Sequence, residues 1–254
     1  MHNSKSWWLA VLAVLLLAVG LPGSYIVGPT SHPITPSTGT PSFVQTAEAH
    51  TTGSGSLSVS FGSLPAISNV VIVGVALSTS APGNLQGTIN DNQNNSYVRV
   101  NNFPINGATT AVTSFWCAVV TTSSGTFTVT LPNTTNATLR GIMIFEYANT
   151  SCNPDKSTGA SGATSPYSCG SITTINAKDL LLTAVAPTNG AAGTVTFTPP
   201  AGFTIRNSFG TVASGLPFAV ADDIVSVANT YSPTFGASQN LASTPCILTA
   251  MISQ

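Results

Sequence analysis

The chain has 254 residues, of which only 5% are charged, and its formal net charge is −1. Globular proteins carry about a quarter charged residues, so this surface must be solvated mainly by Ser, Thr, Asn and Gln. Six Lys and Arg residues in all are too few to neutralise a phosphate backbone, which excludes nucleic acid as a partner. A hydrophobic content of 43% can build a core, and a single long apolar run excludes a multi-span membrane protein.

The N-terminus carries that apolar run, from Trp7 to Val19, between Lys5 and Pro22. A basic start, a short apolar core and small residues after it are typical of a secretory signal peptide. If the apolar stretch continues through residues 25–27, the segment is instead an uncleaved membrane anchor. We expect residues 1–23 to be one of these, a hydrophobic leader helix, with membrane contact limited to this leader and the rest of the chain exported.

Residues 24–42 are rich in Pro, Thr and Ser. Such a composition cannot bury enough surface to offset chain entropy, which predicts an extended stalk. His32 lies in this segment, and we interpret it as inert.

From residue 43 onward, apolar residues alternate with Ser and Thr, as in Leu57, Val59 and Phe61. This period of two is typical of half-buried antiparallel strands. Other segments are continuously apolar, which predicts strands buried on both faces or covered by loops: 70–77, 142–145, 180–185 and 247–252. No segment has a helical period with caps. We therefore expect residues 43–254 to form an all-β domain, a two-sheet antiparallel β-sandwich of jelly-roll type.

Four cysteines in an exported chain favour two disulfides. Cys152 and Cys169 flank a segment rich in Gly, Ser and Pro, and we expect them to pair across it. Cys117 and Cys246 both lie in apolar strands, where they either bridge neighbouring strands or remain buried thiols.

Several motifs follow one another in a familiar order, namely Leu57–Phe61, Asn69–Leu77, Ile89–Tyr97, Gly125–Thr130 and Ile144–Tyr147 with Asp155 after it. Residues 43–254 in this order resemble a recurrent secreted β-sandwich domain of bacterial and archaeal surface proteins. In that family the middle motif reads Asp-x-x-Gly-Asn-x-Tyr and the later one Glu-Tyr-Ser-Gly. Here Asn94 replaces the first Gly, and Ala148 and Asn149 replace Ser-Gly. The resemblance implies a fold and an extracellular or cell-surface location, and no catalytic activity.

Two acidic residues in these motifs invite a chemical interpretation. Asp91 begins a polar run that we interpret as a tight turn. A calcium site at Asp91 is the alternative, but Gln93 and Ser96 stand where EF-hand spacing requires a carboxylate and a glycine. Glu146 ends an apolar strand, where a hydrogen-bonded or calcium-binding role is more common than catalysis. We expect no metal and no cofactor.

An enzymatic function has little support in this composition. His50 is the only histidine of the exported body, so a triad or a zinc site would depend on it. A glycosidase needs two carboxylates, and Glu146 could pair with Asp155, Asp91 or the Asp222 and Asp223 pair. Trp116, the only tryptophan after the leader, lies in an apolar strand, which disfavours a sugar cleft. We expect no catalytic residue.

Four Asn-x-Ser/Thr sequons, about the number expected by chance, lie in expected loops and are candidates for glycosylation: Asn94, Asn133, Asn136 and Asn149.

The remaining interpretation is a surface or assembly protein. A sandwich has open edges, and few charges are available to protect them. Residues 43–52 follow the stalk and could be donated to a neighbouring subunit's sheet, or form the first strand of their own sheet. We expect an exported, non-enzymatic structural or adhesive protein. One form of this role is a filament subunit that self-assembles through strand addition or surface glycans, and the other is a monomeric surface domain. The alternatives are a carbohydrate-binding module and a two-carboxylate glycoside hydrolase.

Overall fold

The computed structural model describes residues 39–79, 88–105, 110–133, 137–187, 193–210, 216–241 and 243–254. These residues belong to one compact unit, residues 36–254. All regular elements among them are β-strands, which confirms the predicted all-β class. In this part of the chain no helix has the length and apolarity needed to cross a membrane. The predicted leader and residues 24–38 of the predicted stalk lie outside the described residues.

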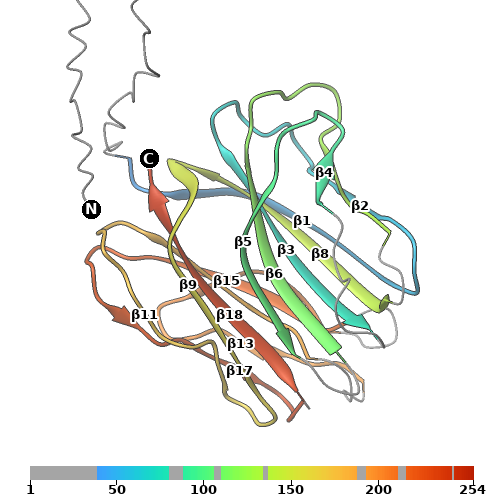
Figure 1. The fold of residues 1–254 in the computed structure, drawn as a ribbon, viewed down its shortest axis with the longest axis vertical. Helices are drawn as coiled ribbons and strands as arrows, with labels where there is room; N and C mark the ends of the chain where they lie inside the picture. The colour runs from blue at the N-terminus through green and yellow to red at the C-terminus, as the bar shows by residue number, and fades with distance from the viewer. Residues whose placement is uncertain are drawn as a thin grey trace, which may run out of the picture. The chain divides into compact units, whose positions relative to one another are not determined.

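The first half of the unit forms one large and one small antiparallel sheet (Figure 1). The large sheet has the order β1-β8-β3-β6-β5 and the small one β2-β7-β4. The strands are β1 (Ser42–Thr52), β2 (Leu57–Ser60), β3 (Val70–Thr79), β4 (Asn90–Asp91), β5 (Val98–Ile105), β6 (Thr110–Val119), β7 (Thr128–Leu131) and β8 (Ala137–Ala148).

The second half forms a large sheet of order β14-β15-β12-β18-β9, a small sheet β10-β17-β13 and the pair β11-β16. Its strands are β9 (Thr150–Gly162), β10 (Tyr167–Ser168), β11 (Ile172–Thr173), β12 (Leu180–Val185), β13 (Phe197–Thr198), β14 (Thr204–Phe209), β15 (Phe218–Ile224), β16 (Thr230–Tyr231), β17 (Thr234–Ala237) and β18 (Thr244–Ser253).

The two halves repeat one fold. Read from β9, the second large sheet runs β9-β18-β12-β15-β14, which matches β1-β8-β3-β6-β5 strand for strand, and β10-β17-β13 matches β2-β7-β4. Bulges fall at matching places, after Arg99 in β5 and after Ile205 in β14. The residues two positions before β3 and β12, Ser68 and Lys178, both have left-handed φ angles, 74° and 65°. This internal repeat was not predicted from the sequence.

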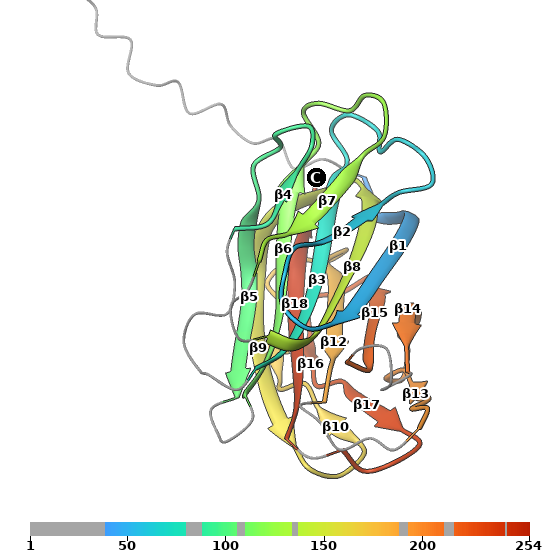
Figure 2. The same cartoon turned by 90° about the vertical axis from the view of Figure 1, so that its right-hand side faces the viewer.

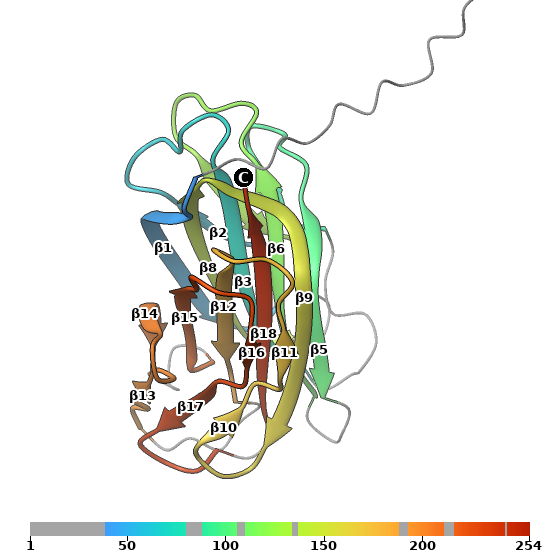
Figure 3. The same cartoon turned by 90° about the vertical axis from the view of Figure 1, so that its left-hand side faces the viewer.

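The two large sheets pack face to face as the predicted sandwich, and a small sheet covers the outer face of each. Figure 2 shows β2, β7 and β4 over the first large sheet, and Figure 3 shows β10, β11 and β17 over the second. In β3, Val70 and Ile72 face the core between the large sheets, whereas Val71 and Val73 face the core beneath β2 and β7. Burial on both faces explains why the central strands are continuously apolar.

The two segments of the second half that were predicted to be buried on both faces, residues 180–185 and 247–252, have the same pattern. In β12, Leu180 and Leu182 point into the core between the large sheets. Leu181 and Val185 point into a third core, beneath β10, β13 and β17. The jelly-roll order therefore occurs twice, and the chain stacks four β layers rather than two.

All four cysteines are paired, but the predicted pairing is wrong. Cys117 bonds to Cys152 and Cys169 to Cys246. The segment after Cys152 is not a loop but the edge strand β9, which pairs with β18. Cys246 of β18 lies opposite Ala160, eight residues along β9 from Cys152, so Cys169, which bonds to Cys246, lies near the other end of this strand from Cys152.

The Cys117–Cys152 bond joins the two halves, since β6 belongs to the first large sheet and β9 to the second. The position that corresponds to Cys117 in the second half is Asp222, because Cys117 pairs with Ile72 and Asp222 with the matching Leu182. Asp222 is 1% exposed and accepts hydrogen bonds from Tyr147 Oη at 2.8 Å and Arg206 Nε at 2.7 Å. The second half therefore has an aspartate where the first half has Cys117, and the hydrogen bond from Tyr147 to this aspartate also links the two halves.

Candidate functional site

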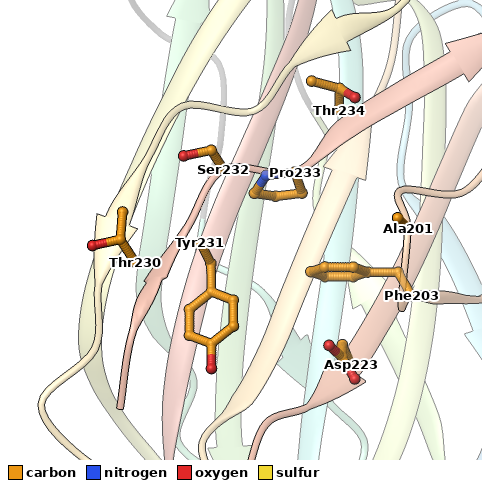
Figure 4. Close-up of a pocket in the computed structure, with 8 residues that line it drawn as sticks. All are labelled: Ala201, Phe203, Asp223, Thr230, Tyr231, Ser232, Pro233 and Thr234. Atoms are coloured by element: carbon orange, nitrogen blue, oxygen red, sulfur yellow. The ribbon is translucent and has the colours of Figure 1, made fainter. Parts of the chain in front are cut away.

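A cavity of about 310 Å³ opens on the second half, and eight residues line it: Ala201, Phe203, Asp223, Thr230, Tyr231, Ser232, Pro233 and Thr234. In Figure 4, the rings of Phe203 and Tyr231 and the carboxylate of Asp223 border the same hollow. The hydroxyl-bearing residues Thr230, Ser232 and Thr234 are exposed. The cavity therefore combines two aromatic rings, one carboxylate and several hydroxyls.

Local sequence explains how these side chains meet. Residues 200–203 form a turn closed by a hydrogen bond from Phe203 N to Pro200 O at 3.0 Å. Gly202 in this turn has a φ of 87°, and a Cβ there would lie 3.3 Å from Asp223 Oδ2. A glycine is thus needed both for the turn and for the approach of the carboxylate. Tyr231 lies in β16 and pairs with Ile172 of β11.

The electrostatics of the cavity are set by partial burial. Burial raises the pKa of Asp223, and the nearby Asp222 carboxylate adds to this effect. Burial, followed by the charges of Asp223 and Asp179, raises the pKa of the Tyr231 phenol. Tyr231 Oη donates to Val227 O at 2.7 Å. The phenol therefore stays protonated and fixed at neutral pH, with its ring exposed to the cavity.

Glu146, the first carboxylate considered for catalysis, is buried and surrounded by donors. Gln45 Nε2 and Asn69 Nδ2 each donate to it at 2.6 Å, and Ala66 N donates at 2.8 Å. Glu146 therefore anchors the loop before β3 to β1 and β8, which agrees with the predicted hydrogen-bonded role.

Asp91 closes the tight turn that the sequence predicted. Its carboxylate accepts hydrogen bonds from Gln93 N at 2.9 Å, from Asn95 N and Nδ2 at 3.0 and 2.9 Å, and from Tyr97 Oη at 3.1 Å. Asn94, within this turn, has a φ of 63°, a conformation that Asn tolerates better than most residues. The donors occupy the oxygens that a calcium ion would need.

The structure does not bring the proposed carboxylate pairs into one site. Glu146 and Asp91 serve separate loops, and Asp222 faces the interior between the large sheets while its neighbour Asp223 lines the cavity. Asp155 instead lies beside Asp179, a residue that the sequence analysis did not single out. Among the described residues, no group of three or more His, Cys, Asp and Glu side chains is placed to hold a metal ion.

The other predicted residues lie apart from the cavity. His50 lies in β1, where Nδ1 is 3.1 Å from Glu48 Oε2 and the ring stacks on Phe209 at 4.4 Å between centroids. Trp116 is 7% exposed, within the core beneath the first small sheet. Three of the predicted glycosylation sites are exposed, Asn94, Asn133 and Asn149, and Asn136 lies outside the described residues.

Comparisons of the chain with protein-family models, curated proteins and solved structures give no match. The site must therefore be interpreted from its own chemistry. Of the cavity residues, only Asp223 was a candidate from the sequence. Phe203 and Tyr231 lie in segments without a distinctive motif, and only the pairing of β16 with β11 and the turn before β14 bring them together.

Proposed function

We propose that this protein is an exported, non-enzymatic structural or adhesive component of a cell surface or extracellular material. Two disulfides are typical of proteins in an oxidising compartment. A non-enzymatic role is supported by Glu146, Asp91 and Asp222, three of the carboxylates considered for a hydrolase, because each accepts hydrogen bonds from structural donors.

The observation that carries the structural role is a β-sandwich with sparsely charged sheet edges. The edges of the two large sheets are β1, β5, β9 and β14. β9 is charged only at Asp155 and Lys156, and its remaining length to Gly162 is uncharged and free of bulges. Natural proteins usually protect such an edge with charges or bulges. Residues 42–52 pair with β8 of their own chain, so we place assembly at β9 rather than in donation of β1.

Edge pairing through β9 is tested by adding charge to that edge. We expect negative-stain microscopy of the native exported protein to show filaments or ordered oligomers, and the Ser157→Lys/Ser161→Lys variant to lose them without a change in melting temperature. Both serines are exposed. Ser54→Lys/Ser226→Lys adds the same charge at exposed positions outside the strands and should still assemble. Monodisperse monomers of the unaltered protein over a wide concentration range would contradict this proposal.

The cavity favours a second function, carbohydrate binding. Sugar rings present C–H faces that pack on aromatic rings and hydroxyls that donate to a carboxylate. Phe203, Tyr231 and Asp223 supply these groups, and a volume of about 310 Å³ is at the lower end for a ligand pocket. A saccharide unit at the end of a glycan chain fits this chemistry.

Glycan binding is tested with a saccharide array followed by calorimetry on the best ligand. We expect Phe203→Ala and Asp223→Asn each to weaken binding by about tenfold or more, because each removes a contact worth about 1.4 kcal/mol or more. Ile67→Ala, which trims an exposed side chain of the first half, should leave the affinity unchanged. If all three variants bind as the unaltered protein does, the cavity is not the glycan site.

A further inference from the structure

Asp179 is a buried carboxyl group without a donor. It precedes β12, its exposed fraction is 0%, and neither of its carboxylate oxygens has a hydrogen-bond partner. Burial raises the pKa of Asp179 to about 7, and the adjacent Asp155 contributes both a hydrogen bond and its charge. A hydrogen bond between two carboxyl groups requires that one of them carry a proton.

In the first half, the position that corresponds to Asp179 is occupied by an amide side chain that has a hydrogen-bond partner. Asn69 corresponds to Asp179, since each precedes the central strand and follows a residue with left-handed φ. Asn69 Nδ2 donates to Glu146 Oε1, which also accepts Ala66 N from the same loop. In the second half, Asp155 Oδ2 accepts Ile175 N at 2.6 Å, so Asp155 takes the place of Glu146. An amide-to-acid bond in one half has become an acid-to-acid contact in the other.

The surrounding charges do not neutralise this pair. Lys156 of β9 and Lys178 are exposed, and no ion pair joins either to Asp155 or Asp179. The ionisable groups that approach from β15 and β16 are Asp223 and Tyr231, and a charged Asp223 would only add repulsion. With two carboxyl groups and no third metal-ligating side chain grouped with them in the described residues, a proton is a better fit than a divalent cation, which takes six or more oxygen ligands.

The loop of residues 172–179 lies against β16, whose residues Thr230 and Tyr231 line the cavity. β11 begins this loop and pairs with β16, so that Ile172 lies opposite Tyr231 and Thr173 opposite Thr230. Thr174 N extends the pairing by donating to Asn229 O at 3.0 Å. Whatever fastens residues 172–179 to β9 therefore also supports the two cavity residues of β16.

We propose that Asp155 and Asp179 share one proton that fastens the loop of residues 172–179 to β9, and that losing this proton as the pH rises loosens the loop and the Tyr231 wall of the cavity. In this step one carboxyl O–H bond breaks, the proton passes to water, and two carboxylates remain in contact. Their repulsion and the burial of Asp179 then oppose the closed loop.

The direction of the pH effect follows from linkage. Unfolding returns Asp179 to its ordinary pKa of 3.8, whereas the folded value is about 7. Between these values the folded state binds more protons than the unfolded state, so stability falls as the pH rises. The contribution is fully present below about pH 4 and is lost by about pH 7.

Two reciprocal variants test the shared proton. Asp179→Asn restores the amide donor of the first half, so it should raise the melting temperature by several degrees at pH 8.5 and leave it nearly unchanged at pH 4. Asn69→Asp creates a second acid pair with Glu146, so it should lower the melting temperature at pH 8.5 more than at pH 4. Thermal unfolding followed by circular dichroism measures both. If the Asp179→Asn variant shows the same pH profile as the unaltered protein, the proposal is wrong.

Hydrogen exchange localises the effect. After correction for intrinsic rates, peptides covering residues 169–179 and 227–234 should exchange several-fold faster at pH 8.5 than at pH 6 in the unaltered protein with EDTA. Peptides covering residues 61–69, the matching loop of the first half, should not, and neither should any of these peptides in Asp179→Asn. If calcium ions restored protection at pH 8.5, a cation would occupy the pair and the proton proposal would be overturned.

Discussion

Replacing Cys117 and Cys152 together by alanine is expected to lower the free energy of unfolding by about 4 kcal/mol and the melting temperature by roughly 8–16 °C. The bond closes a sequence separation of 35 residues and links β6 of the first half to β9 of the second. Without it, the unfolded chain gains entropy and only noncovalent contacts hold the halves together. Chemical denaturation and differential scanning calorimetry measure the loss.

The connectivity itself can be read from one digest. Cleavage after Arg99, Arg140, Lys156, Lys178 and Arg206 places each cysteine in a different tryptic peptide: 100–140, 141–156, 157–178 and 207–254. Without reduction, we expect 100–140 joined to 141–156, and 157–178 joined to 207–254. A product joining 141–156 to 157–178 would show that Cys152 pairs with Cys169 and that β9 does not run as described. The Cys169→Ala/Cys246→Ala variant is the matched control for the loss of the link between the halves, because the bond that it removes lies within the second half.

Replacing Asp222 by alanine is expected to cost about 3 kcal/mol, because it leaves two donors without an acceptor between the large sheets. Tyr147 is fully buried and would lose the acceptor of its hydroxyl group on the second large sheet, the Asp222 carboxylate. Arg206 is partly exposed and also stacks on Phe43 at 4.5 Å from the ring centroid, so water can recover part of its hydrogen bonding. Urea denaturation of the variant measures the loss.

Two smaller changes separate the contributions to this contact. Tyr147→Phe removes one donor and leaves the Arg206 bond, so we expect a loss of about 1 kcal/mol. Asp222→Asn keeps an acceptor but removes the charge, and its effect should lie between those of Tyr147→Phe and Asp222→Ala. Equal stability of Asp222→Ala and the unaltered protein would show that the contact between the halves is not formed.

The strand content could be predicted because it depends on local chemistry. The alternation of Leu57, Val59 and Phe61 with serines is typical of a strand with one solvent-exposed face, and all three residues lie in the core beneath β2 and β7. The continuous apolar run of β3 indicated burial on both faces, and Val70 and Val71 indeed face different cores. Asp91 could be assigned to a turn because its donors lie within six residues of it.

The features that could not be predicted depend on contacts between distant segments. The segment after Cys152 has the composition of a loop, yet pairing with β18 makes it an edge strand, and this alone reverses the disulfide pairing. The internal repeat is visible in the strand order, in the bulges and in the left-handed residues before β3 and β12, which are all properties of the folded backbone. Asp179 and Asp155, 24 positions apart, meet only because β9 and β12 flank β18 in one sheet.

The scarcity of charge and the alternation of apolar residues with hydroxyls are enough, by themselves, to determine an all-β protein with a hydroxyl-rich surface. These properties depend on composition and on a two-residue period, which any partner strand preserves. Only the tertiary structure decided that the fold occurs twice, which cysteines pair, and that Phe203, Tyr231 and Asp223 share a cavity. The reason is that strand pairing across more than a hundred residues is selected by the packing of whole sheets, and no local pattern encodes that choice.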